Sequence, residues 1–174
     1  LRDMVLFGAL APGQPVTIQG LILGLGAGMT PVREAIRRLT AEGALEPQGN
    51  RRVTVPRLQP AVLDQLAFAR LTIEPRLAEL AAAAMTPALI AQLTALDGRV
   101  NDAIRAGDVA GYLSANHAFH FALYEASGAG VLIDMARSMW LRFGPSLRVV
   151  ATLAGASGLP DQHAEALAAM RAGD

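Results

Sequence analysis

The sequence contains no cysteine and no lysine, and its formal net charge is zero. Without cysteine there are no disulfides and no thiolate metal ligands. No apolar run reaches the length of a membrane-spanning helix, and residues 1–10 are too short and wrongly flanked for a signal peptide. We therefore expect a cytoplasmic protein. The use of arginine as the only cationic residue indicates a GC-rich coding bias rather than a function.

The zero net charge conceals two parts of opposite sign. Residues 1–57 hold seven arginines and four acidic residues, which gives +3, and residues 58–174 hold eight arginines and eleven acidic residues, which gives −3. A basic head on an acidic body is typical of a DNA-binding domain joined to a separate sensor domain. With 52% hydrophobic residues, the chain has ample material for a core.

The stretch from Met29 to Gly43 predicts a short amphipathic helix. Thr30 is expected to cap its N-terminus, Pro31 to take the first helical position and Gly43 to end it. Apolar side chains at the i, i+3, i+4, i+7 spacing predict one buried stripe, formed by Val32, Ala35, Ile36 and Leu39. Another side of the helix carries Arg33, Arg37 and Thr40. Taken alone, that side is more readily interpreted as a solvated face than as a DNA-recognition surface.

The segments on either side of this helix favour DNA binding. Residues 21–26 end a preceding helix and residues 26–28 form a tight turn, which is the order of a helix-turn-helix. Residues 45–55 predict a β-hairpin with a turn at Gly49 and Asn50. Its tip carries two arginines, Arg51 and Arg52, and would serve as a basic wing beside the recognition helix.

Residues 1–57 resemble the winged helix-turn-helix domain of the GntR superfamily of bacterial transcription regulators. The resemblance rests on Leu10–Gly13, Leu25–Gly26, Thr30–Leu39, Glu42–Gly43 and the wing from Gly49 to Val55. It implies that Arg33, Arg37 and Thr40 enter the major groove, with Thr30 near the backbone and Arg51 or Arg52 in the minor groove. Gly28 and Met29 stand where the family usually has a serine and an arginine, so one DNA contact of the common pattern is missing.

The remainder, residues 58–174, predicts an all-helical bundle, so the expected fold class is mostly α with a small β-wing. Pro56 and Pro60 bound an extended linker. The expected helices are Ala61–Ala84 with an interruption at Pro75, 86–106 capped by Thr86, 109–126 capped by Asp108, Val131–Val150 with a possible break at Gly144–Pro145, and Pro160–Ala172.

This second part resembles the FCD ligand-binding domain of the FadR-type branch of the superfamily. The matching pieces are Arg70-x-x-x-Glu74 with Leu80–Ala84, Asn116-x-x-Phe119-His120 with Leu123–Gly128, and His163 with Ala166–Asp174. The resemblance implies a homodimer that binds operator DNA and a small carboxylate effector. The family has a further histidine-bearing helix after the position of Asp174, so we expect residues 58–174 to lack the last helix of the domain.

Asn116 and His120 lie one turn apart on the 109–126 helix, where an imidazole and a side-chain oxygen can supply two metal ligands. His163 can supply a third. The resemblance implies a divalent metal, zinc or nickel or similar, that helps to hold an organic acid, with Asn116 in the position of an aspartate as a weaker, neutral donor. The alternative is that these histidines are ordinary hydrogen-bonded residues. His117 points away from the pair and is expected at the surface.

Two arginines are secondary candidates for an anionic effector, Arg70 and Arg142, although Arg70 and Glu74 fit an intrahelical ion pair better and nothing in the sequence places Arg142 at the site. Two other functions stay open. A metal-dependent enzyme would need an open metal position and a general base, and no catalytic motif is present. The second alternative is a protein-interaction bundle whose N-terminal domain no longer binds DNA. It stays open because Met29 stands where the family usually has an arginine.

Overall fold

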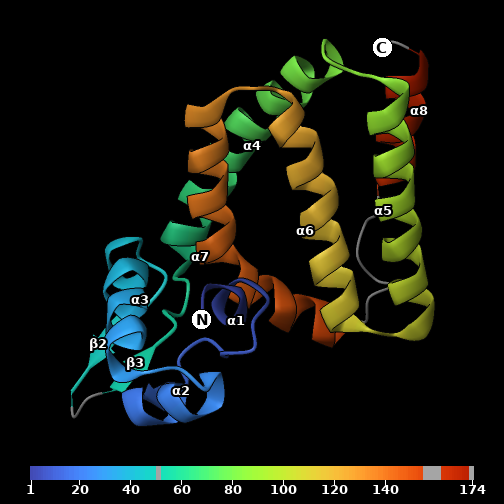
Figure 1. Ribbon diagram of the computed structural model, residues 1–174. Helices are drawn as coiled ribbons and strands as arrows, with labels where there is room; N and C mark the ends of the chain where they lie inside the picture. Colours follow the sequence, from blue (N-terminus) through green and yellow to red (C-terminus); the bar gives the residue numbers. More distant parts are fainter. Residues whose placement is uncertain (50–51, 155–161, 173–174) are drawn as a thin grey trace. The chain divides into compact units, whose positions relative to one another are not determined.

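The structure is a computed structural model that describes residues 1–49, 52–154 and 162–172 (Figure 1). Eight helices and three strands lie in this part of the chain, so the mostly helical fold class is confirmed. The residues group into two compact units. Unit 1 comprises residues 1–66 and 138–149, and unit 2 comprises residues 67–137 and 150–174. The domain boundary between residues 57 and 58 stays a prediction.

Unit 1 contains the predicted helix-turn-helix and wing. Its elements are α1 (Arg2–Leu6), β1 (Pro15–Thr17), α2 (Ile18–Leu25), α3 (Met29–Ala41), β2 (Glu46–Gln48) and β3 (Arg52–Thr54). The Thr17 hydroxyl caps α2 by accepting a hydrogen bond from the Gly20 N–H at 2.9 Å. Gly26, with φ +59°, then turns the chain toward α3 in the left-handed conformation that glycine adopts without strain.

The start of α3 differs from the prediction. Gly28 is the N-cap residue, in extended conformation, and no side chain caps the helix. The prediction that Thr30 caps the helix was therefore wrong. Because α3 begins at Met29, Pro31 lies in the first turn, where a missing N–H has no helical acceptor to lose. The end of α3 is as expected, since Gly43 follows the C-cap Glu42 with a positive φ.

The wing is a three-stranded antiparallel sheet in the order β1-β3-β2. The β2–β3 hairpin was predicted, and its register pairs Pro47 with Val53. Strand β1 was not predicted, because three residues that end at the N-cap Thr17 are too few to show an alternation of their own. It forms only through its partner, with Val16 opposite Val53.

The core of unit 1 joins the helix-turn-helix to a segment far along the chain. Leu21 of α2 and Val32 and Leu39 of α3 are buried with Val5 of α1. Leu141, which belongs to the later helix α7, is fully buried in the same cluster. A segment of α7 is therefore part of the packing that supports α3.

Unit 2 is built from the helical segments that follow. The elements are α4 (Pro60–Ala82), α5 (Pro87–Ala106), α6 (Val109–Ala126), α7 (Gly130–Ala154) and α8 (His163–Ala172), and the first residues of α4 and the middle of α7 belong to unit 1. Helix α5 packs against both α6 and α8. In the described part of the chain no helix is long and apolar enough to span a membrane.

The predicted caps of α5 and α6 are confirmed. Thr86 accepts from the Leu89 N–H at 3.2 Å, and Asp108 accepts from the Gly111 N–H at 3.0 Å.

The interruptions expected at two prolines were wrong, since α4 continues through Pro75 and α7 continues through Pro145. Each proline removes one backbone donor, and packing of the surrounding helix outweighs that loss. The expected helix start at Pro160 lies outside the described residues.

Candidate functional site

The exposed face of α3 carries three arginines, of which two are tied to one carboxylate. Arg37 donates to Glu34 through Nε at 3.0 Å and Nη2 at 2.9 Å, and Arg38 donates through Nε at 3.1 Å. These bonds lower the pKa of Glu34 to about 2. Arg33 is exposed, and no hydrogen bond or ion pair to it occurs among the described residues. Arg33 is thus the arginine of this face whose guanidinium is available without breaking a bond within the helix.

The other predicted DNA contacts differ in accessibility. Thr30 is exposed at the start of α3, and Arg52 is exposed on β3. Thr40 is half-buried, and its hydroxyl oxygen is buried without a hydrogen-bond partner in the described chain. Arg51 lies outside the described residues. The structure therefore presents Thr30, Arg33 and Arg37 on α3, whereas the Thr40 oxygen faces inward.

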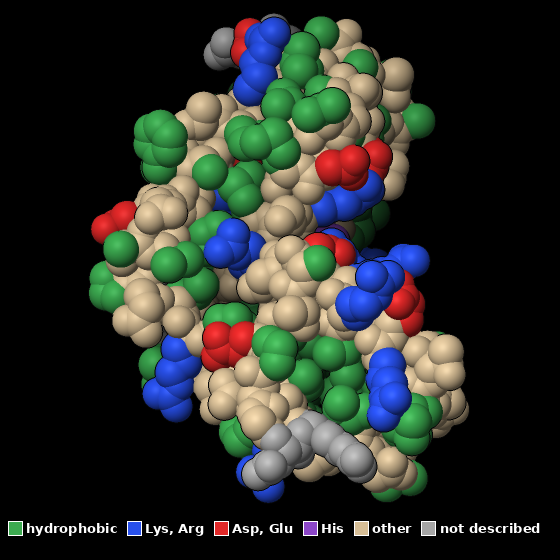
Figure 2. Space-filling model, turned by 90° about the vertical axis from the view of Figure 1, so that its left-hand side faces the viewer, with side chains coloured by type: hydrophobic (Ala, Val, Ile, Leu, Met, Phe, Trp, Pro, Cys, Tyr) green, Lys and Arg blue, Asp and Glu red, His purple; other side chains and the backbone are tan. Residues whose placement is uncertain are grey.

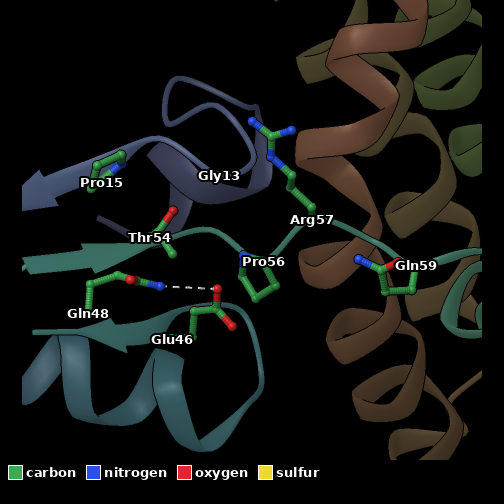
Figure 3. Close-up of a pocket in the computed structure, with 8 residues that line it drawn as sticks. All are labelled: Gly13, Pro15, Glu46, Gln48, Thr54, Pro56, Arg57 and Gln59. Atoms are coloured by element: carbon green, nitrogen blue, oxygen red, sulfur yellow. Dashed lines mark hydrogen bonds between the residues drawn. The ribbon is translucent and has the colours of Figure 1, made fainter.

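A shallow polar pocket of about 380 Å³ lies at the base of the wing (Figure 3). Its lining consists of Gly13, Pro15, Glu46, Gln48, Thr54, Pro56, Arg57 and Gln59. The Arg57 side chain lies close against Gly13 and occupies the place that a Cβ atom would take, and the φ of +78° at Gly13 independently favours glycine. Glu46 and Arg57, the charged residues of the lining, are both exposed. The pocket is thus a surface groove between the wing and the linker rather than an enclosed ligand site.

In unit 2 the structure brings together the two histidines that the sequence proposed as ligands. The Nε2 atoms of His120 on α6 and His163 on α8 lie 3.4 Å apart. Phe119 stacks on the His163 ring with 4.0 Å between centroids, and His163 is buried. Asn116, one turn before His120, is also buried. Two residues 43 positions apart in sequence therefore share one point in the interior of the bundle.

A chain of polar contacts leads from His120 to α4. The Tyr124 hydroxyl lies 3.2 Å from Nδ1 of His120, and the Glu74 carboxylate lies near the same hydroxyl. Glu74 in turn accepts two bonds from Arg70, at 2.7 and 3.2 Å, which confirms the predicted ion pair. Burial, followed by the nearby Glu74 carboxylate, raises the pKa of Tyr124. The pKa of His120 is lowered to about 3, mainly by burial, and the nearby His163 and Arg70 lower it further.

Asp97 of α5 lies on the opposite side of the histidine pair. Its Oδ1 atom is 3.6 Å from Nδ1 of His163, and Oδ2 accepts from the Asn101 side chain at 3.2 Å. Sequence reasoning missed Asp97 and Tyr124. Tyr124 follows His120 by four residues, a spacing that places both on one helix face. Asp97 carried no local signal, because its approach to His163 depends on how α5 packs against α8.

The histidine pair meets part of what a metal site requires. The two Nε2 atoms lie 3.4 Å apart, close to the ligand–ligand distance of a tetrahedral zinc site, which is about 3.3 Å for Zn–N bonds of 2.0–2.1 Å. Within the described ranges, however, no three His, Cys, Asp or Glu side chains are grouped to hold a metal. The described residues thus supply two histidine nitrogens at one point, fewer protein ligands than a metal site with three or four of them has.

The remaining candidates lie elsewhere. His117, expected at the surface, is half-buried and stacks on Phe121 with 4.3 Å between centroids. Arg142 belongs to unit 1, where its guanidinium lies beside Gly43 at the end of α3. The histidine pair belongs to unit 2.

Comparisons with known proteins agree on both parts of the chain. Residues 1–55 match the model of the bacterial regulatory proteins of the gntR family, and residues 65–174 match the FCD domain. The chain is 33% identical over 147 residues to the HTH-type transcriptional regulator McbR of Escherichia coli, covering 84% of this chain and 66% of McbR. It is 31% identical over 130 residues to an HTH-type regulator of Streptomyces ambofaciens, covering 75% and 54% of the two chains.

The solved structure of E. coli McbR/YncC has a TM-score of 0.92 and 30% identity, covering 99% of this chain and 83% of that one. A putative regulator from Rhodococcus sp. RHA1, at 20% identity, covering 98% of this chain and 93% of that one, shares the fold with a TM-score of 0.67. The chain spans just under two thirds of the length of McbR and about half the length of the Streptomyces regulator. The family models and the McbR relationship together show that the chain belongs to the GntR family of bacterial transcription regulators, in the FadR-type branch that carries an FCD domain.

Proposed function

We propose that this GntR-family chain regulates transcription by binding operator DNA as a homodimer, under the control of a small organic acid that unit 2 senses with a divalent metal. The observation that carries the sensor part is the pair of Nε2 atoms 3.4 Å apart in the interior of the bundle. Both curated relatives are named as transcription regulators, which favours this function over the enzyme alternative. A protein that acts on operators works in the cytoplasm, which is its proposed location.

On the DNA side, α3 would enter the major groove with Arg33 reading a base edge. An arginine whose Nε and Nη atoms are available can make the bidentate contact to guanine, and Arg33 meets that condition. Arg37 would first have to break its hydrogen bonds with Glu34, or bind through the edge of its guanidinium that faces away from Glu34. Arg52 on the wing and Thr30 at the start of α3 would contact phosphate or the minor groove, which positions the helix without reading the sequence.

On the sensor side, His120 and His163 would hold the metal and Asn116 would add a neutral oxygen. A divalent cation bound there supplies positive charge for a carboxylate. The protein contributes the buried surroundings, because Phe119 and Tyr124 shield the pair from water and strengthen electrostatic attraction. Arg70 is held by Glu74 in two hydrogen bonds, so we assign its role to that ion pair before any effector contact.

Coupling between sensing and DNA binding would run through α7. Leu141 lies in the core that supports α3, whereas residues 130–137 of the same helix belong to unit 2. A ligand changes DNA affinity only if it prefers one arrangement of the dimer over another. A helix that contributes residues to both units is suited to transmit such a preference.

The homodimer is supported by large apolar side chains left uncovered on unit 2. Phe68 and Leu71 on α4 are 74% and 76% exposed, and Val131 on α7 is 77% exposed. Figure 2 shows hydrophobic side chains between the charged ones on the visible surface. Such residues commonly mark an interface, and a second copy of the chain would also supply the second DNA-binding head.

The test is DNA affinity with and without the proposed ligands. Operator DNA is first selected from a random pool by the full-length protein, and its Kd is then measured with Zn²⁺, with a panel of small carboxylates, and with both. We expect at least one carboxylate to change Kd by roughly 5- to 150-fold, and only when metal is present. Equal Kd values across the whole panel would contradict the sensor function and leave DNA binding standing.

A further inference from the structure

We propose that Met29 is a specificity-determining residue, which contacts the C5 methyl group of a thymine in the operator, close to the base read by Arg33. The inference deepens the proposed DNA-binding function and rests on it. Met29 is the first residue of α3 and is 50% exposed. In α3, all of whose residues the structure describes, no other large apolar side chain is exposed. The exposed side of this helix thus begins with an apolar group and continues with arginines.

Met29 lies on the same row of α3 as two arginines assigned to DNA. Residues four apart in an α-helix lie one above the other, so Met29, Arg33 and Arg37 form a row. All three are exposed, whereas Val32 and Leu39 are buried in the core of unit 1. At roughly 1.5 Å per residue, Met29 lies about 6 Å from Arg33 along the helix axis, which is less than two base-pair steps of about 3.4 Å each. A base edge near the one read by Arg33 is therefore within reach of Met29.

The position of Met29 at the N-terminal end of α3 favours the groove over the DNA backbone. In a helix-turn-helix the N-terminal residues of the second helix contact base edges in the major groove, while the first helix crosses the backbone. The preceding residue, the N-cap Gly28, is exposed and has no side chain that would cover Met29. Single exposed apolar residues are common on protein surfaces, and Leu23 of α2 is 74% exposed. Met29 differs from Leu23 because it stands in the row of the reading arginines.

The chemistry of methionine determines which base feature it can recognise. Its side chain has no hydrogen-bond donor and no charge, and the thioether is only a weak acceptor, so it does not pair with phosphates or with the polar atoms of a base. The apolar feature of the major-groove edge is the C5 methyl group of thymine, which apolar side chains contact. The flexible, polarizable methionine chain adapts readily to such a group. Thymine is therefore the base that Met29 favours, near a guanine bound by Arg33.

Uracil tests the contact, because it differs from thymine only in lacking the C5 methyl group. The full-length protein first selects its operator from a random DNA pool, and each thymine of that operator is then replaced in turn by uracil. Fluorescence anisotropy gives the Kd of each duplex. We expect one replacement, close to the base pair at which Arg33→Ala relaxes preference, to weaken wild-type binding by roughly 4-fold, as expected for the loss of one buried methyl group.

Variants of Met29 show whether this side chain makes the contact. Met29→Ala should bind the thymine and uracil duplexes equally, because the shorter side chain no longer reaches the methyl group. Met29→Leu keeps an apolar side chain and should retain a thymine preference of roughly 2-fold or more. The matched control is Met135→Ala, which removes a 48% exposed methionine from unit 2 and should keep the full preference. Thermal unfolding checks that every variant is folded.

Salt dependence separates the apolar contact from a charged one. Met29 releases no counterions from DNA, so Met29→Ala should weaken operator binding without changing the slope of log Kd against log salt concentration. Arg52→Ala is the comparison, since loss of a phosphate contact reduces that slope by about one. A slope reduced equally in both variants would contradict the role assigned to Met29.

The outcomes also distinguish this inference from the function on which it rests. An operator that requires Arg33, but whose affinity for wild-type protein is unchanged by every uracil replacement, would end the role of Met29 and leave DNA binding standing. A methyl effect that persists in Met29→Ala would also overturn the proposal, because another group would then contact the thymine. Protein that selects no operator would end the DNA-binding role of α3 and this inference with it.

Discussion

Gly144 of α7 lies directly against the backbone of Leu6 of α1. A Cβ atom at position 144 would overlap the carbonyl oxygen of Leu6, which is backbone and has no rotamer to move away. About one turn earlier on α7, Leu141 is fully buried in the core that contains Val32 and Leu39 of α3. The close approach of α7 to α1 is therefore part of what holds the DNA-binding helix in place.

The first prediction concerns this contact. Gly144→Ala should destabilise the protein by roughly 1–3 kcal/mol, because the added methyl group forces α7 away from α1. Urea unfolding measures the change. The control is Gly98→Ala on α5, where a Cβ atom meets nothing within 4 Å. In that helix alanine should stabilise by about 0.5–1 kcal/mol. Equal stability of the two variants would contradict the described packing.

Thr40 provides a second prediction, because sequence and structure assign it different surroundings. Its hydroxyl oxygen is buried and unsatisfied within the described residues. Thr40→Val removes this oxygen at nearly constant shape and should leave stability equal or higher by up to about 1 kcal/mol, with operator affinity unchanged. Fluorescence anisotropy with operator DNA is the measurement. A loss of affinity of tenfold or more would instead support the base contact that the sequence suggested.

Glu34 gives the third prediction. It accepts three hydrogen bonds from Arg37 and Arg38 and stays ionised at neutral pH, because those bonds lower its pKa to about 2. Glu34→Gln should release both arginines and raise affinity for non-specific DNA by roughly 3- to 10-fold, with a steeper salt dependence. Glu79→Gln makes the same charge change on α4 and should have no such effect. An unchanged salt slope in Glu34→Gln would argue against α3 as the DNA-binding surface.

The fourth prediction separates base reading from backbone contact. Arg33→Ala should cost roughly 1–3 kcal/mol on the selected operator and relax preference at one or two base pairs. Arg52→Ala should weaken binding by a similar factor on all sequences and reduce the salt slope by about one. Competition with single-base operator variants distinguishes the two effects. Equal, sequence-independent losses in both variants would contradict the roles assigned to α3 and the wing.

The local parts of the fold were predictable from sequence. Caps, turn glycines and apolar spacing indicated α5 and α6 with bounds close to those observed, because these signals act within a few residues. The helix-breaking effect expected of Pro75 and Pro145 was wrong, since tertiary packing overrides a local penalty. Strand β1 and the position of Leu141 in the core of unit 1 depend on contacts between segments far apart in the sequence, and no local sequence pattern indicates such contacts.

The candidate site was likewise predictable where it depends on local spacing and not where it depends on contacts between distant helices. Asn116 and His120 share one helix face, so their proximity followed from spacing, and the Arg70–Glu74 ion pair did as well. The approach of His163 and Asp97 depends on the packing of α8 on α5, which the sequence does not encode at any fixed spacing. Only the resemblance to the FCD domain placed His163 beside His120 beforehand.

Metal content is the measurement that tests the central claim most directly. Full-length protein is purified without chelator and analysed by mass spectrometry for bound divalent metal, beside His120→Ala/His163→Ala and the control His117→Ala. We predict close to one metal ion per chain in wild type and in the control, and none in the double variant. Metal-free wild-type protein, or metal retained by the double variant, would contradict the proposed sensor site at His120 and His163.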